Sequence, residues 1–256
     1  MDIITLTSDY GEKDYHVSVI KGALLSVNKK IQIVDISHQI ENYNIVEAAF
    51  ILQNAWRSFP KGTIHLVTVN NRPDPLIDFI AVEKNGHFFI GPDNGIFSIV
   101  FEEIPGNIYV LPNEGDEPAR LRGYFAYAVG HLTSGRPLHE IGMPHKNPVE
   151  RLTFQPVTGP SSIRGSVIYI DNFGNVVINI TRRLFEQVGN HRNFKLYVKR
   201  NEPITEIHKQ YFDVPIGEVL CRFNSLGFIE LAGNMAKASN LLGLTVEDSV
   251  DIEFSN

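Results

Sequence analysis

The feature that most constrains the fold is an alternation of short apolar runs with amphipathic segments near the N-terminus. Apolar runs at residues 3–7, 31–36 and 63–69 predict buried strands. Between them, residues 13–27 and 47–59 carry apolar side chains at helical spacing, and we expect helices there. Because a strand–helix–strand–helix–strand order is typical of a parallel sheet covered by helices, the sequence predicts an α/β domain with a mostly parallel sheet.

The pattern changes further along the chain. Residues 79–82 and 87–90 flank Asn85-Gly86, which is typical of a tight hairpin. A compact apolar helix is expected at 124–132. From there on the sequence predicts mainly short strands, at residues 165–170, 176–180, 194–198, 219–223, 228–231 and 250–254.

A stretch rich in proline and glycine separates these two patterns, and it shows little periodicity. We therefore expect an N-terminal α/β domain over residues 1–150, a linker over 151–162 and a smaller β-rich C-terminal domain over 163–256.

Composition narrows the possible functions. The formal net charge is −6, which disfavours nucleic acid as a partner. No apolar run is long enough to span a membrane, and the N-terminus lacks the basic start of a signal peptide. A single cysteine, Cys221, cannot form an internal disulfide and is expected in a buried strand, so we expect a cytoplasmic protein. The nine histidines, among them His38 and His131, lack zinc-site spacing, and we expect no metal.

Asp9 lies where the first predicted strand meets its helix, in the segment Ser8-Asp9-Tyr10-Gly11. Ligands of parallel α/β sheets bind beyond the carboxyl ends of the strands, and a carboxylate there can accept hydrogen bonds from a ribose diol. Capping of the following helix is the alternative, because Asp is a common N-cap. A single glycine beside an acid disfavours phosphate binding.

Two turns between predicted strands of the second domain carry polar side chains. In the first, Asp171 can bind an ammonium group, Phe173 can stack on a purine, and Asn175 can hydrogen-bond to the edge of the base. A tight hairpin with Phe173 in the core is the alternative. In the second, residues 224–227, Ser225 can bind a carboxylate, and an ordinary turn is the alternative.

Taken together, these segments resemble the S-adenosylmethionine (SAM) hydroxide adenosyltransferase family, the SAM hydrolases, which are related to the fluorinase and the chlorinase. The resemblance covers essentially the whole chain and rests on the order and spacing of several motifs. The matching segments are residues 7–11 with 21–22, 34–38, 59–63, 91–95, 170–175, 224–230 and 238–244.

The resemblance implies a homotrimer that holds SAM between the N-terminal domain of one subunit and the C-terminal domain of its neighbour. By position, Asp9 would bind the ribose hydroxyls, Phe173 and Asn175 would contact adenine, and Asp171 and Ser225 would hold the ammonium and carboxylate of the methionine part. The implied reaction is attack of water or hydroxide on the ribose 5′ carbon, which yields methionine and adenosine. SAM is then the substrate or ligand, and no separate cofactor is implied.

The sequence departs from the family at the catalytic residues. After the third strand, the hydrolases carry Asp-Pro-Gly-Val-Gly followed by Arg. Here Asn70 stands in place of the catalytic Asp, Arg72 in place of the Arg, and Asp74 is a substitute carboxylate. Arg120 takes the place of the catalytic His. Asn70 cannot accept a proton at neutral pH and Arg120 stays charged, so we expect a more positive site.

Three functions are compatible with this sequence. The first is SAM hydrolysis with rearranged catalytic residues. The second is binding of SAM or adenosine without turnover, and the third is the same fold with another ligand or a partner protein. Halide transfer to SAM is less favoured, because the chain is short for the extra loop of the fluorinase.

Overall fold

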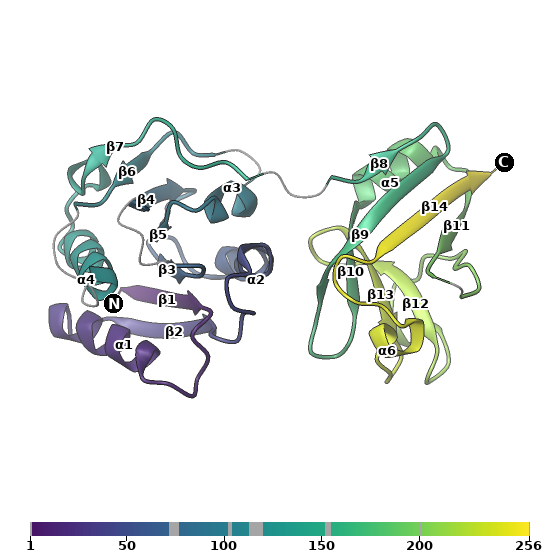
Figure 1. Cartoon of the computed structure of the whole chain (residues 1–256), viewed down its shortest axis with the longest axis horizontal. Helices are drawn as coiled ribbons and strands as arrows, with labels where there is room; N and C mark the ends of the chain where they lie inside the picture. The colour runs from purple at the N-terminus through teal and green to yellow at the C-terminus, as the bar shows by residue number, and fades with distance from the viewer. Residues whose placement is uncertain are drawn as a thin grey trace. The chain divides into compact units, whose positions relative to one another are not determined.

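The computed structural model describes residues 2–71, 77–101, 104–112, 120–151, 155–199 and 201–255, apart from the side chain of Arg120. The chain forms two compact units, Met1–Leu152 and Thr153–Asn256. In Figure 1 the first unit runs from purple to teal and the second from green to yellow.

A seven-stranded sheet in the order β2-β1-β3-β5-β4-β6-β7 forms the centre of the first unit. The strands β2, β1, β3 and β5 are parallel neighbours, whereas β4, β6 and β7 pair antiparallel. The direction changes at the hairpin of Asn85 and Gly86, both of which have positive φ. The bounds are β1 Ile3–Ser8, β2 Gln32–Ser37, β3 Ile64–Thr68, β4 Phe79–Lys84, β5 His87–Pro92, β6 Ile108–Val110 and β7 Met143–Pro144.

Helices bury apolar stripes against both faces of this sheet. On one face Leu24 and Phe125 of α1 and α4 pack in a cluster with Leu66, and on the other Leu52 of α2 packs in a cluster with Val67. The hairpin and both βαβ units agree with the predicted α/β class, which is confirmed. The bounds are α1 His16–Val27, α2 Ile45–Ala55, α3 Ile96–Val100 and α4 Arg120–Thr133, with 3₁₀ turns at Trp56–Ser58 and Leu138–Glu140.

The second unit is built on an antiparallel sheet in the order β11-β14-β9-β10-β13-β12, with β8 paired to β9. All six predicted strands are present. Val157 and Thr158 form β8, so part of the stretch predicted as a linker belongs to this sheet. Cys221 is fully buried in β12, as expected. The strands are β8 Val157–Thr158, β9 Ser162–Ile170, β10 Val176–Thr181, β11 Asn193–Tyr197, β12 Val219–Phe223, β13 Phe228–Gly233 and β14 Ser249–Ser255.

Two helices of the second unit were not predicted. They are α5, Arg182–Gly189, and α6, Ala238–Leu242. A 3₁₀ turn, η3, spans Tyr211–Asp213. Within the described ranges, every helix is too short or too polar to cross a membrane.

Candidate functional site

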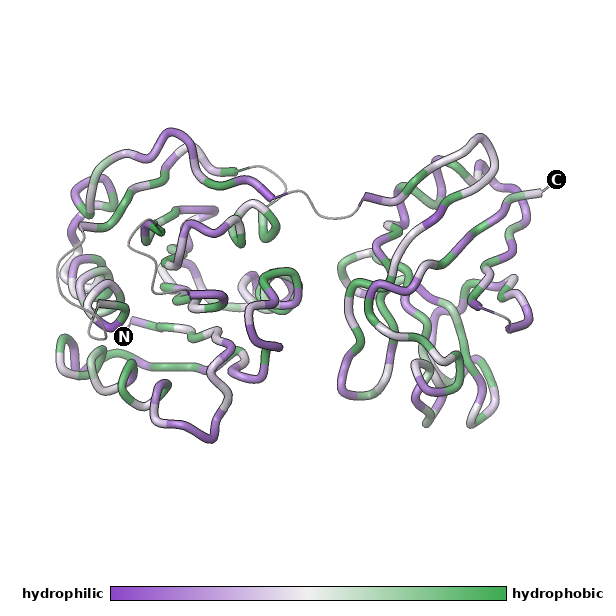
Figure 2. The backbone as a smooth tube through the Cα atoms, viewed as in Figure 1, coloured by the Kyte–Doolittle hydropathy of each residue, from purple (hydrophilic) through white to green (hydrophobic). Residues whose placement is uncertain are grey.

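The carboxyl ends of β1 and β3 lie side by side, because Ser8 pairs with Thr68 in parallel register. Asp9 follows β1 and is 7% exposed. Its Oδ2 accepts hydrogen bonds from the backbone N–H groups of Tyr43, at 2.9 Å, and Asn70, at 3.1 Å. One carboxylate oxygen therefore joins the ends of β1 and β3 to the loop before α2. The segment between β1 and α1 is mostly hydrophilic (Figure 2).

The alternative that Asp9 caps the following helix is wrong. The helix α1 begins only at His16, its N-cap residue is Tyr15, and no side chain caps it. The carboxylate instead faces the neighbouring loops. Among the described residues, Oδ1 of Asp9 has no hydrogen-bond partner. Its lone pairs can therefore accept hydrogen bonds from a ligand.

Asn70 is held in the left-handed region, with φ of 53°. Asn tolerates this conformation better than most residues. Its side-chain Oδ1 is buried and has no hydrogen-bond partner within the described part of the chain. Asn94 supports the same loop, since its Nδ2 donates to the carbonyl of Val69 at 2.9 Å. The structure thus places Asp9 and Asn70 together.

The other predicted catalytic residues cannot be placed. Arg72 and Asp74 lie outside the described residues. Arg120 is the first residue of α4, and its side chain is not described. Their predicted roles therefore stay predictions.

A chain of polar side chains lies beside Asp9, in segments to which the sequence assigned no role at the site. Ser8 Oγ lies 2.7 Å from His38 Nδ1, and His38 Nε2 lies 3.0 Å from Asp35 Oδ1. Asp35 Oδ2 accepts from Lys21 Nζ at 2.5 Å. Partial burial of Asp35 opposes its ionisation, but the hydrogen bonds from Lys21 and His38 outweigh this effect and hold its pKa below the usual value. Ser8 and His38 are buried.

In the second unit, Asp171 organises the loop between β9 and β10. Its Oδ1 accepts from the backbone N–H groups of Phe173, at 2.9 Å, and Asn175, at 2.8 Å. Its Oδ2 accepts from Asn175 Nδ2 at 2.8 Å. Phe173 is 75% exposed, so the alternative that places it in the core is wrong. The loop presents a free aromatic ring beside a fixed carboxylate and a buried amide.

Ser225 does not lie near this loop. It is exposed in the turn between β12 and β13, which Asn224 closes by accepting the N–H groups of Leu226 and Phe228. Because β10 and β13 are antiparallel, this turn lies at the opposite end of β10 from Asp171. The strand has six residues, so a separation of roughly 15–20 Å is expected. Within this unit, the structure does not bring Asp171 and Ser225 together.

The sequence did not indicate a buried charged group beside Asp171. Glu230 is 7% exposed and pairs across the strands with Arg222. The hydroxyl of Tyr211 donates to Glu230 Oε1 at 3.2 Å, and Arg222 lies over the Tyr211 ring. Burial raises the pKa of Glu230, and the nearby charge of Asp171 adds to the effect. The sequence feature that could have predicted this group is an acidic residue within the otherwise apolar strand β13.

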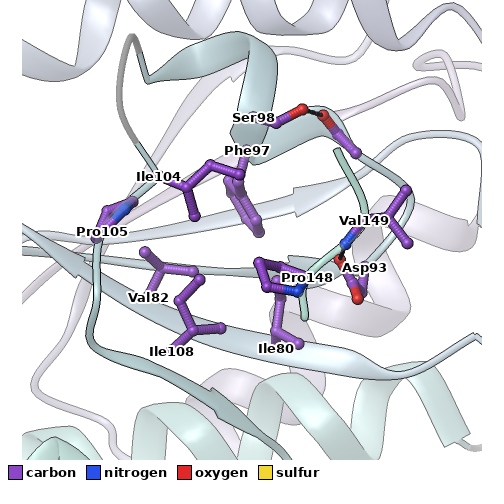
Figure 3. Close-up of a pocket in the computed structure, with 11 residues that line it drawn as sticks. Ile80, Val82, Asp93, Phe97, Ser98, Ile104, Pro105, Ile108, Pro148 and Val149 are labelled. Atoms are coloured by element: carbon purple, nitrogen blue, oxygen red, sulfur yellow. Dashed lines mark hydrogen bonds between the residues drawn. The ribbon is translucent and has the colours of Figure 1, made fainter. Parts of the chain in front are cut away.

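The first unit also contains a small pocket. It is lined mainly by apolar side chains, including Ile80, Val82 and Phe97, and Asp93 at its edge binds the N–H of Val149 at 2.9 Å (Figure 3). None of the predicted ligand residues lines it. In the described ranges, no group of three His, Cys, Asp or Glu side chains is arranged to hold a metal.

Comparisons with known proteins extend over both units. Residues 4–142 match the model of the SAM hydroxide adenosyltransferase N-terminal domain, and residues 165–251 match that of the C-terminal domain. The (R)-S-adenosyl-L-methionine hydrolase of Methanocaldococcus jannaschii is 30% identical over 98% of this chain and 96% of its own length.

Two further proteins are similar to this chain, one in sequence and one in structure. A fluorinase of Actinoplanes sp. is 26% identical over 95% of this chain and 96% of its own length. The crystal structure of an uncharacterized conserved protein from Thermotoga maritima superposes with a TM-score of 0.86, at 30% identity, over 98% of this chain and 99% of the other.

Proposed function

Because this chain belongs to the SAM hydroxide adenosyltransferase family, we propose that it hydrolyses SAM to adenosine and methionine. The observation that carries the proposal is the geometry of Asp9. Its carboxylate lies at the carboxyl ends of β1 and β3 and is fixed by two backbone donors, and its second oxygen has no partner among the described residues. This is the place where a parallel sheet binds a nucleoside, and the vicinal ribose hydroxyls can donate to a carboxylate.

The proposed reaction is a substitution at the ribose 5′ carbon. The oxygen of water forms a bond to this carbon, the bond to sulfur breaks, and the electron pair leaves with sulfur as the neutral thioether of methionine. One proton of the water is released to solvent. SAM is the substrate, and the balanced reaction requires no further cofactor. Since the leaving group becomes neutral, alignment of the water with the breaking bond is the main task of the protein.

Asn70 supports such an alignment. Its buried carboxamide oxygen has no protein donor among the described residues and can accept a hydrogen bond from the attacking water. It cannot take the proton, so this proposal predicts slow turnover compared with a site that has a general base. Phe173 and Asn175 contact adenine in the same proposal, and Asp171 acts by holding their loop. The structure favours this role of Asp171 over direct binding of the ammonium group.

The direct test is incubation of the purified protein with SAM at near-stoichiometric concentration, with nucleosides followed by chromatography. Adenosine formation in proportion to protein and time, above a control without protein, is the expected result. Chlorinated adenosine in chloride buffer would instead indicate halide transfer. Unchanged SAM would contradict the hydrolase proposal.

Binding without turnover is the second candidate, and the amide of Asn70 favours it because an amide is no base. In that case a titration with adenosine or SAM would give saturable heat and no product.

A cytoplasmic homotrimer is also part of the proposal. The family resemblance supports the trimer, and the single buried cysteine supports a reducing compartment. Light scattering after size exclusion would measure the mass of the assembly.

A further inference from the structure

The loop that carries Asp9 is tied at both of its ends to one residue, His38. At the start of the loop, the His38 ring lies 2.7 Å from Ser8 Oγ, and that hydroxyl lies 3.5 Å from the N–H of Tyr10. At the end of the loop, the carbonyl of His38 accepts the N–H of Gly11 at 2.7 Å. His38 is 5% exposed, so neither contact is exchanged readily for water.

Asp35 and Lys21 lie beside the second nitrogen of the His38 ring. Asp35 lies 3.0 Å from His38 Nε2, and the Lys21 ammonium group holds Asp35 ionised. A carboxylate at Nε2 favours a proton on this nitrogen. In the neutral ring Nδ1 is then an acceptor, which takes the proton of the Ser8 hydroxyl and leaves the Ser8 oxygen free to accept from Tyr10. The Ser8 hydroxyl is thereby satisfied in one direction, whereas His38 Nε2 lies 3.0 Å from Asp35 Oδ1 without an aligned hydrogen bond among the described residues.

We infer that His38 is a positioning residue, which acts through Ser8 to preset the loop that presents Asp9 to a ribose. This inference rests on the proposed function for its ligand, but the order of the loop can be measured without one. The ring atom that matters is Nδ1, since it makes the contact with Ser8. The atom Nε2 faces Asp35 and has no contact with Ser8.

Two substitutions separate these ring atoms. His38→Asn places an amide near the position of Nδ1 and keeps a partner for Ser8, whereas His38→Gln places the amide near Nε2 and keeps only the contact with Asp35. With adenosine as the probe in calorimetric titrations, we expect His38→Gln to bind about tenfold more weakly, and His38→Asn to stay within about threefold of the wild type. A role in packing alone would make the smaller Asn the worse replacement.

His131 provides a matched control for the same substitution. It is fully buried in α4, and its Nε2 lies 2.8 Å from the carbonyl of Pro137. His131→Gln keeps an amide at this position and has no link to the loop of Asp9, so adenosine affinity should stay within about twofold. Equal losses in His131→Gln and His38→Gln would overturn the inference. Should His38→Gln not fold, Asp35→Asn, at a half-exposed residue, is expected to weaken adenosine binding in the same direction.

Amide hydrogen exchange tests the loop without a ligand. We expect the N–H groups of Tyr10 and Gly11 to exchange faster in His38→Gln than in the wild type, and to be unchanged in His38→Asn and His131→Gln. Exchange that is the same in all four proteins would overturn the inference. Faster exchange with undiminished adenosine affinity would also overturn it. If the wild type neither binds adenosine nor hydrolyses SAM, the proposed function fails, and the exchange data still decide whether His38 orders the loop.

Discussion

Asn70 donates its backbone N–H to Asp9 Oδ2 over 3.1 Å, which joins the residue predicted in place of the family's catalytic acid to the residue predicted to bind ribose. Tyr43 donates to the same oxygen, and within the described ranges the second oxygen of the Asp9 carboxylate has no partner. In the proposed function, this contact links the residue that binds ribose to the residue beside the attacking water. A change at Asp9 affects the position of Asn70, while a change in the Asn70 side chain leaves the backbone contact in place.

Two substitutions of Asp9 should separate its proposed role in ligand binding from its contacts with the backbone of Tyr43 and Asn70. Asp9→Asn keeps an oxygen acceptor for Tyr43 and Asn70 but removes the charge, and we expect adenosine affinity to fall about tenfold with little loss of stability. Asp9→Ala removes the acceptor as well, and the two partly buried N–H groups that lose it should cost about 1 kcal/mol of unfolding free energy. Calorimetric titration and urea unfolding measure the two effects.

Asp213 is the control for Asp9. Its carboxylate also accepts two backbone N–H groups, from Lys209 and Gln210, but it is exposed and lies in the second unit. Asp213→Asn should therefore leave adenosine affinity unchanged. Undiminished affinity in Asp9→Ala would show that Asp9 only connects the loops.

Replacement of Asn70 by Asp tests whether a missing base limits turnover. Asp also tolerates the left-handed backbone of this residue, so the loop should persist. A positioned general base contributes about 10²–10⁴-fold, and we expect Asn70→Asp to raise the rate of adenosine formation at least about tenfold. Asn70→Ser, which supplies no base, is the matched control. A rate that falls in Asn70→Asp would contradict a water site beside Asn70.

The parts of the fold that follow from local sequence patterns were predicted correctly. The apolar runs and helical stripes of the first 70 residues gave the βαβαβ unit, and Asn85-Gly86 gave the hairpin. The helix α5 was missed, although Thr181 caps it by accepting the N–H of Leu184, and Leu184, Phe185 and Val188 are at helical spacing. This spacing was not recognised as helical because α5 has only eight residues and directly follows β10.

The candidate site could be predicted only in part, because its contacts join distant segments. Asp9 and Phe173 could be singled out by their positions at strand ends. The partners of Asp9 could not, since Tyr43 is 34 residues away and owes its contact to a left-handed backbone. The contact between Ser8 and His38 likewise spans 30 residues. No periodicity in the sequence encodes such pairs.

The exposure of Phe173 predicts a split between stability and binding. A side chain that is 75% exposed loses little burial on truncation, so Phe173→Ala should change the free energy of unfolding by less than about 0.5 kcal/mol. Stacking of an aromatic ring on a base is worth about 1–3 kcal/mol, so adenosine should bind at least about fivefold more weakly. Phe173→Tyr keeps the ring and should retain affinity. Titrations that give equal affinity for Phe173→Ala and Phe173→Tyr would remove Phe173 from the adenine site.

Two buried histidines at the centre of the first unit predict a loss of stability in acid. His65 is fully buried, its Nδ1 lies 2.8 Å from Thr5 Oγ1, and its Nε2 lies 3.2 Å from His87 Nδ1. Burial, with the charge of His87 as a smaller cause, lowers the pKa of His65 to about 3. Burial also lowers the pKa of His87, with a contribution from Lys61.

Since the unfolded chain protonates His65 near pH 6.5 and the folded chain does not, stability is independent of this group above pH 6.5 and falls as the pH drops from 6.5 toward 3. At pH 5.5 the loss from His65 should be about 1.4 kcal/mol relative to pH 7.5. Urea unfolding at both pH values measures it. His65→Gln, which cannot be protonated, should lose correspondingly less, whereas His139→Gln, at an exposed histidine, should behave like the wild type. An unaltered pH dependence in His65→Gln would show that His65 is not the group whose protonation destabilises the fold.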